Sequence, residues 1–208
     1  MPRILEKVER RLGEKLFLKG DRCVGPKCAM IRRAYPPGIH GKKRSRGRGS
    51  SEYRELLREK QKVRFFYSLD DGQIKRYVEK ASSRGGVFGE NLLRALERRL
   101  DVVVWRLGFT PSRRTARQAI SHGHITVNGR PISSSSYAVE KGDVVGLGGR
   151  GMKSGMFRAF VEGQHTPPPP SWLALNKEKA QGSVAGLPAA EELGFSFDLA
   201  KVKEFYSQ

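Results

Sequence analysis

The sequence predicts an α+β fold, in which an irregular basic segment precedes a mostly helical domain and a smaller unit of helix and strand. Apolar residues recur at helical spacing over most of residues 51–123 and then alternate with polar ones over residues 124–147. They are sparse before residue 50. With 208 residues, the chain is long enough for one or two domains that each bury a core.

Residues 1–50 are predicted to form a basic N-terminal extension. After a short helical start, this segment has few core-forming side chains and many Gly, Pro and Arg residues. The apolar surface that such a segment can bury does not offset the entropy lost on ordering. We therefore expect it to become ordered against a partner.

Three helices are predicted between residues 51 and 108. SSEYRELLREKQKVRFFYSL carries Leu56, Val63 and Phe66 on one broad face, and DGQIKRYVEKASS repeats apolar residues at i, i+3, i+4 and i+7. ENLLRALERRLDVVVWRLG is predicted to form one continuous helix, with Gly108 at the position that follows a helix end.

A helix followed by strands is predicted after residue 108. In TPSRRTARQAISHGH, Thr110 can cap the helix and Gly123 can end it. HITVNGRPI then predicts a strand, an Asn-Gly turn and a second strand, and YAVEKGDVVGL predicts another strand pair around Lys141-Gly142. QHTPPPPSW is typical of a stiff spacer, and DLAKVKEFYSQ of a terminal helix that can pack on the helices at 51–83.

Four regions follow from these elements. The predicted boundaries are residues 1–50 for the extension, 51–94 for the first part of the helical domain, 95–165 for the α-then-β unit, and 166–208 for a linker that returns to the helical domain.

The charge of the chain indicates a polyanionic partner. Lys and Arg number 40 against 21 Asp and Glu, which gives a formal net charge of +19. Such an excess destabilises a compact state unless a polyanion neutralises it, which favours nucleic-acid binding over a merely solvated basic surface. Neither an apolar run of membrane-spanning length nor a signal peptide is visible, so we expect a cytosolic or organelle-matrix protein without a membrane partner.

The helix at residues 110–123 carries the pattern that is most typical of a binding surface. Two adjacent polar stripes are predicted, one of Arg113 and Arg117 and one of Arg114, Gln118 and His122. Arginine suits phosphate because its planar guanidinium donates two hydrogen bonds at once. The turn at residues 122–124 and the hairpin tip at residues 128–130 can extend this surface.

This region also resembles a known RNA-binding module. SRRTARQAISHGHITVNGRPISSSSYAVEKGD resembles the signature of the S-four RNA-binding domain, or alpha-L motif. YPPGIHG, LREKQKVRFFY, GENLLRALERRLDVVVWRLGF, PPPPSWL and EFYSQ appear in the same order as in the bacterial-type S-four family of small-subunit ribosomal proteins. The resemblance covers nearly the whole chain, and it implies a mostly helical domain with an inserted alpha-L domain.

The resemblance implies a structural constituent of the small ribosomal subunit rather than an enzyme. In the family, the protein binds the five-prime domain of small-subunit ribosomal RNA and nucleates assembly. It then lies near the messenger RNA entry channel, beside the ribosomal proteins numbered three and five, and contributes to decoding accuracy. No small-molecule substrate is expected, and the expected location is the ribosome, in the cytoplasm or in an organelle matrix.

Charge and resemblance together predict a set of RNA-binding residues. They are Arg22, Lys27, Arg32, Arg33, His40, Lys42, Lys43, Arg44, Arg58, Lys62, Arg113, Arg114, Arg117, Gln118, His122, His124, Asn128 and Arg130.

Two other classes of protein remain open from the sequence. An RNA-modifying enzyme with an appended alpha-L domain is one, although little chain would remain for a catalytic domain and GLGGRGMKSG lacks the glycine that precedes the lysine of a P-loop. A structural DNA-binding protein is the other, since charge alone does not exclude it.

The two cysteines raise the question of a metal site. Zinc-binding members of the S-four family use four cysteines, and Cys23 and Cys28 match only the later pair. Structural zinc needs four ligands, and His40 is one candidate for a third. We expect no cofactor, with zinc as the alternative, and no disulfide between these cysteines in a reducing compartment.

Overall fold

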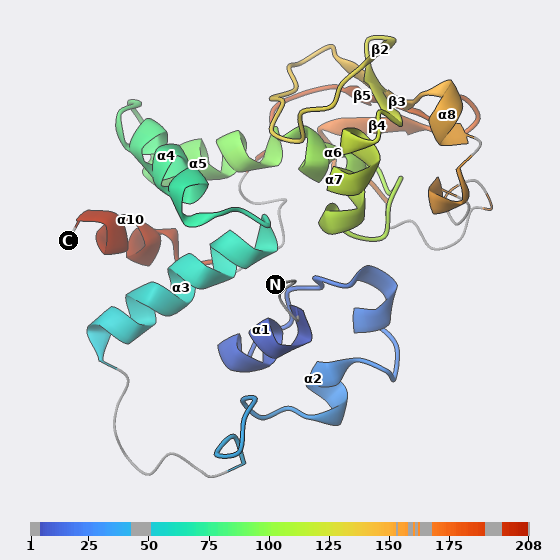
Figure 1. Cartoon of the computed structure of the whole chain (residues 1–208). Coiled ribbons are helices and arrows are strands. Elements are labelled where there is room, and N and C mark those ends of the chain that lie inside the picture. The colour runs from blue at the N-terminus through green and yellow to red at the C-terminus, as the bar shows by residue number, and fades with distance from the viewer. Residues whose placement is uncertain are drawn as a thin grey trace. The chain divides into compact units, whose positions relative to one another are not determined.

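The computed structural model describes residues 5–42, 51–152, 154–157, 160, 162, 168–189 and 197–207 (Figure 1). The chain divides into two compact units, of which unit 1 comprises residues 1–75 and 196–208 and unit 2 comprises residues 76–195. Unit 1 is helical and unit 2 combines helices with an antiparallel sheet, so the predicted α+β class is confirmed. The predicted boundaries at residues 50, 94 and 165 stay predictions.

The described part of the N-terminal extension has a small core of its own. It contains α1 (Leu5–Leu12), η1 (Gly20–Cys23) and α2 (Ala29–Arg32). The Glu9 carboxylate is buried and accepts hydrogen bonds from the backbone N–H groups of Leu16 and Leu18. Because this carboxylate accepts from the backbone N–H groups of the loop after α1, that loop can be buried without unpaired donors. The buried apolar side chains of the segment are Leu12, Leu16, Leu18, Cys23 and Cys28.

Three longer helices complete the description of unit 1. They are α3 (Glu52–Phe66), the start of α4 (Asp71–Ser82) and α10 (Leu199–Ser207). α10 packs on α3, one of the helices on which the sequence allowed it to pack, with Val202 fully buried and the Tyr53 and Phe205 rings 5.8 Å apart (Figure 1). Asp70 and Gln73 exchange hydrogen bonds between side chain and backbone, which caps the start of α4.

The helix predicted over residues 90–108 is interrupted. The structure has α5 (Phe88–Glu97) and α6 (Leu100–Arg106), with extended backbone at Arg99 between them. The loop before β3 supplies hydrogen-bond partners for the backbone at the break. The N–H of Leu100 donates to the carbonyl of Tyr137, and the N–H of Val139 donates to the carbonyl of Arg98. Gly108 has a φ of 75°, which only glycine adopts readily, and it follows α6 as predicted.

The helix and hairpin that follow agree with the sequence in all but the cap. α7 (Arg113–Ser121) is capped by Ser112, whose hydroxyl accepts from the N–H of Thr115, rather than by Thr110. β1 (Ile125–Val127) and β2 (Arg130–Pro131) are joined by Asn128 and Gly129 at φ values of 50° and 79°. This is the predicted Asn-Gly hairpin.

The sheet extends beyond the strands that the sequence predicted. Its antiparallel order is β2-β1-β3-β5-β4, with β3 (Val144–Leu147), β4 (Leu173–Asn176) and β5 (Gln181–Val184). The strand pair predicted around Lys141-Gly142 is absent, since β3 pairs with β1 and β5 while Ala138 makes only an isolated bridge to Arg99. Part of the predicted linker therefore supplies two strands. Residues 164–167 of the proline-rich spacer lie outside the described residues.

The core of unit 2 lies between two helices and the sheet. Apolar side chains of α6 and α7 pack with those of the strands: Leu100, Val103, Val104, Leu107, Ala116, Ala119, Ile120, Ile125, Val127, Val145 and Val184. Two short helices follow β3, namely α8 (Gly149–Met152) and η2 (Gly155–Phe157). Among the described residues, no helix is long and apolar enough to cross a membrane.

Candidate nucleic-acid interface

α7 presents a polar face to solvent because its apolar face is fixed in the core. Ala116, Ala119 and Ile120 are fully buried against the sheet. The opposite side of the helix therefore faces outward, and the side chains there are Arg114, Gln118 and His122. The second predicted stripe is thus exposed and available to a ligand.

The first predicted stripe is only partly exposed. Arg113 is 5% exposed, and its guanidinium lies 3.9 Å from the centre of the Trp105 ring, a cation–π contact. Arg117 is half-buried, and its Nε donates to Asp101 at 2.7 Å. Arg113 stacks on α6 and Arg117 is anchored to it, so this stripe offers less free charge to a ligand than the residue pattern indicates.

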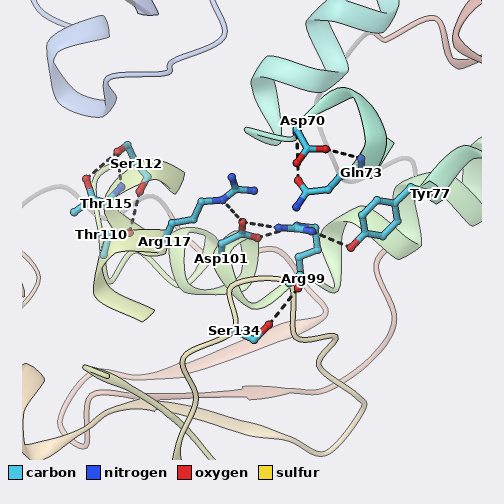
Figure 2. A network of polar contacts seen from close by, with 11 residues as sticks. Asp70, Gln73, Tyr77, Arg99, Asp101, Thr110, Ser112, Thr115, Arg117 and Ser134 are labelled. Carbon is cyan, nitrogen blue, oxygen red and sulfur yellow. Dashed lines mark hydrogen bonds and ion pairs between the residues drawn. The ribbon is translucent and has the colours of Figure 1, made fainter. Parts of the chain in front are cut away.

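A buried polar network fixes α7 relative to α6 (Figure 2). Arg99 donates from Nε and Nη2 to the two oxygens of Asp101, at 3.1 and 2.9 Å, and from Nη1 to the Tyr77 hydroxyl at 2.9 Å. The side chains of Arg99 and Asp101 are each 1% exposed. Burial alone lowers the pKa of Arg99, but the adjacent Asp101 carboxylate and Tyr77 hydroxyl outweigh it and raise that pKa, so Arg99 stays charged. Sequence reasoning missed this network.

The turn after α7 adds two histidines to the polar surface. His122 is exposed, and its ring lies 5.9 Å from that of His124. The Nδ1 atom of His124 is buried, and it has no hydrogen-bond partner within the described part of the chain. Arg130 is exposed at the start of β2, and the extension of the RNA-binding surface to the hairpin tip stays a prediction.

Asn128 has a structural part in this hairpin. Its Nδ2 donates to Asp143 at 2.8 Å, and its Oδ1 accepts from the N–H of Val144 at 2.9 Å. Both ends of the amide are therefore engaged in joining the hairpin to β3. A contact between this side chain and RNA would compete with those bonds.

Four of the predicted basic residues of unit 1 surround one cavity. It has a volume of about 280 Å³, and Arg22, Lys27, Arg32 and Arg33 contribute to its wall. Two basic side chains of α1 that sequence reasoning did not single out, Lys7 and Arg10, also line this cavity. Glu6 is the single acidic residue among the lining residues, and it forms an ion pair of 3.2 Å with Arg22. We call this group the N-terminal basic cavity.

The two predicted residues of α3 contact other parts of unit 1. Arg58 is exposed, but its Nη2 donates to the carbonyl of Leu12 at 2.6 Å. Lys62 is buried, with its ammonium 2.6 Å from Glu14 and 2.7 Å from Glu59. Burial alone lowers the pKa of Lys62, but the hydrogen bonds that its ammonium donates to Glu14 and Glu59 outweigh this effect and raise that pKa. In this arrangement the charge of Lys62 is neutralised within the chain.

The remaining predicted residues lie at the end of the described extension. His40 and Lys42 are exposed, and the Lys42 ammonium lies 5.6 Å from the centre of the Tyr35 ring. Lys43 and Arg44 lie outside the described residues.

Comparison with known proteins identifies the family. Residues 5–97 match the ribosomal protein S4/S9 N-terminal domain and residues 98–145 match the S4 domain. The small ribosomal subunit protein uS4 of Halothermothrix orenii is 47% identical over 96% of this chain and 94% of its own length. The uS4 proteins of Pelotomaculum thermopropionicum and Thermus thermophilus are each 46% identical over the same shares. The chain belongs to the uS4 family of small ribosomal subunit proteins.

The two basic surfaces of this uS4 family member belong to its two matched domains. The N-terminal basic cavity lies in the S4/S9 N-terminal domain, and α7 with the hairpin lies in the S4 domain. The resemblance expected from the sequence is thereby confirmed, while the RNA contacts of individual residues stay predictions.

The two cysteines of this uS4 family member lie in the small core of the extension. Cys23 and Cys28 are each 3% exposed and are not joined by a disulfide. Burial raises the pKa of the Cys23 thiol above its usual range, so the neutral thiol is favoured in this core. Within the described residues, no group of three or more His, Cys, Asp or Glu side chains is placed to hold a metal ion. Both thiols pack among the apolar side chains of this core, and the expectation of no metal stays a prediction.

Proposed function

We propose that this uS4 chain binds small-subunit ribosomal RNA as a structural component of the ribosome. The observation that carries the proposal is the polar face of α7, where Arg114, Gln118 and His122 are exposed in a segment that matches the S4 domain. The relatives at 46–47% identity are named as small ribosomal subunit proteins, which supports ribosomal RNA as the polyanion that the charge requires.

The chemistry of this face suits recognition of RNA shape. An A-form duplex hides its base edges in a deep, narrow major groove, so phosphates and two-prime hydroxyls carry most of the contact. Arg114 can donate to phosphate, while Gln118 and His122 can reach sugar hydroxyls or base edges. The buried network behind α7 holds this face rigid, which lowers the entropy that binding costs.

The proposals on the RNA domain, the neighbouring proteins and the role in translation rest on similarity to a uS4 protein over 96% of the chain. We propose that the chain binds the five-prime domain of the RNA early and nucleates subunit assembly. Its proposed neighbours are the ribosomal proteins numbered three and five, and messenger RNA near the entry channel. Contribution to decoding accuracy follows from that position.

We also propose that the chain has neither catalytic activity nor a metal cofactor. Its match extends over 94% of the length of uS4 relatives, which favours the structural component over an RNA-modifying enzyme with an added S4 domain. The described residues contain no group of three or more His, Cys, Asp or Glu side chains placed to hold an ion, which supports the proposal on metal. Metal analysis of purified small subunits tests it, and one zinc per chain would contradict it.

The test of RNA binding compares two nucleic acids and two variants. The chain should bind a transcript of the five-prime domain more tightly than duplex DNA of equal length at physiological salt. Arg114→Gln with Arg130→Gln should weaken RNA binding and reduce the salt slope by about 0.7–0.9 for each phosphate that the variant no longer neutralises. Lys177→Gln with Lys179→Gln removes the same charge from exposed positions and serves as control. Equal affinity for RNA and DNA would contradict the proposal.

A further inference from the structure

A second basic cavity lies in unit 2 and uses none of the residues assigned above to RNA. Its volume is about 200 Å³, and its wall is formed by α4, α5 and the loop before β3. Four cations line it and no acidic residue does: Lys80, Arg84, Arg94 and Arg98. We call this group the α4–α5 cavity.

The wall of the α4–α5 cavity is held by the backbone around it. Asn91 donates from Nδ2 to the carbonyl of Gly85 at 3.0 Å, which fixes the connection between the two helices next to Arg84. Arg98 donates from Nε to the carbonyl of Val139 at 2.8 Å, which joins α5 to the loop. The fold therefore holds Arg98 in place and fixes the backbone of the connection that carries Arg84.

Most of the positive charge in this cavity is not neutralised by the described part of the chain. Lys80, Arg84 and Arg94 form no ion pair there, and Arg98 contacts the exposed Glu140 at 3.4 Å. The Nε of Arg94 is buried and, among the described residues, has no hydrogen-bond acceptor. A buried donor without a partner is unfavourable, so the site favours a ligand that brings an anionic oxygen.

We infer that the α4–α5 cavity binds a backbone phosphate of ribosomal RNA, an inference that rests on the proposed function. Its volume lies below the roughly 300–1,000 Å³ of small-molecule pockets, which favours a single phosphate over a whole nucleotide. The hydroxyl of Tyr77, which lines the cavity, accepts from Arg99, so its own proton remains for a phosphate oxygen. This contact positions the RNA and reads no base.

The first test removes two exposed cations of the cavity. Lys80→Gln with Arg84→Gln should leave the circular dichroism spectrum of the full chain unchanged, because both side chains are exposed. Binding to the five-prime-domain transcript should weaken at least tenfold, and the salt slope should fall by about 1.4–1.8, the value for two phosphate contacts. Lys177→Gln with Lys179→Gln is the matched control, with an equal loss of charge and a smaller effect expected. Equal losses in the two double variants would overturn the inference.

The second test uses inorganic phosphate without RNA. The nitrogen resonance of Arg94 Nε, assigned with Arg94→Lys, should shift saturably as phosphate is added, and the shift should be lost in Lys80→Gln with Arg84→Gln. Absence of any shift would overturn the anion site. A shift in the unmodified chain, combined with unchanged RNA binding by Lys80→Gln with Arg84→Gln, would show that the cavity binds a free anion. That result would overturn the inference that it binds an RNA phosphate. A chain that binds no ribosomal RNA would instead refute the proposed function, while the titration still reports on the cavity.

Discussion

Asp101 links two segments of the S4 domain through one buried carboxylate. It is fully buried, and its two oxygens accept hydrogen bonds from Arg99, just before α6, and from Arg117 on α7 (Figure 2). A buried charge of this kind is strongly destabilising when one partner is removed, because the others remain desolvated and unpaired. The position of the polar face of α7 therefore depends on one carboxylate beneath it.

Replacing Asp101 with Asn should destabilise the free chain by about 3–5 kcal/mol, because two arginines lose their counter-charge. Urea unfolding of the full chain measures this change. Glu140→Gln is the control, since that carboxylate is 78% exposed in its ion pair with Arg98, and its loss should change stability by at most about 1 kcal/mol. Similar effects in the two variants would show that the network does not stabilise the fold.

The Cys23 thiol should react slowly in the native chain. Burial raises its pKa, so the folded state keeps the proton at pH values where the unfolded state has lost it, and stability falls as pH rises through about 9. In Cys28→Ser, the labelling rate with a thiol reagent should stay low up to pH 9 and increase strongly in urea. Native labelling as fast as in urea would show that the extension is not packed as described.

At the scale of elements, the close contact between the end of α6 and β5 depends on Gly182, which has no side chain. A Cβ atom added at Gly182 would lie 2.3 Å from Cδ2 of Leu107, which is buried under the sheet. Gly182→Ala should therefore cost about 1–3 kcal/mol through overpacking. Gly85→Ala meets no atom within 4 Å and is the control in the same thermal or urea unfolding series. An unchanged midpoint in Gly182→Ala would contradict the packing of β5 on α6.

Elements with a strong local pattern were predicted from the sequence, and those set by distant partners were not. The helix α3 follows from apolar spacing, and the β1–β2 hairpin follows from Asn128-Gly129. The break between α5 and α6 was missed because Leu96, Leu100 and Val103 continue the helical period across it. The loop at residues 137–139, about 40 positions later, supplies the hydrogen bonds that make the break favourable.

The same contrast between local patterns and distant partners separates the predicted site residues that the structure brings together from those that it pairs elsewhere. Arg22, Lys27, Arg32 and Arg33 were predicted from local charge density, and the structure brings them to one cavity. Lys62 was predicted on the same grounds, but its partner Glu14 is 48 positions earlier and removes it from solvent. Arg113 and Asn128 likewise meet partners from other elements, which a residue pattern within one helix or turn does not reveal.

At the scale of the whole molecule, the net charge of +19 should limit the stability of the free chain. Like charges repel in the compact state, and salt screens them over a Debye length of about 10 Å at 0.1 M. Raising sodium chloride from 0.02 to roughly 0.5 M, a range chosen to span that screening, should therefore raise the urea midpoint. A falling midpoint would indicate that internal ion pairs such as Lys62–Glu59 outweigh the repulsion.

Sedimentation with small-subunit ribosomal RNA is the most direct measurement of the proposed RNA binding. The purified chain is mixed with protein-free small-subunit RNA, washed at high salt and centrifuged through sucrose. We expect one chain per RNA to sediment with it, and Arg114→Gln with Arg130→Gln to lower this fraction. A chain that stays at the top of the gradient, or that sediments equally with duplex DNA of similar length, would contradict ribosomal RNA as the partner.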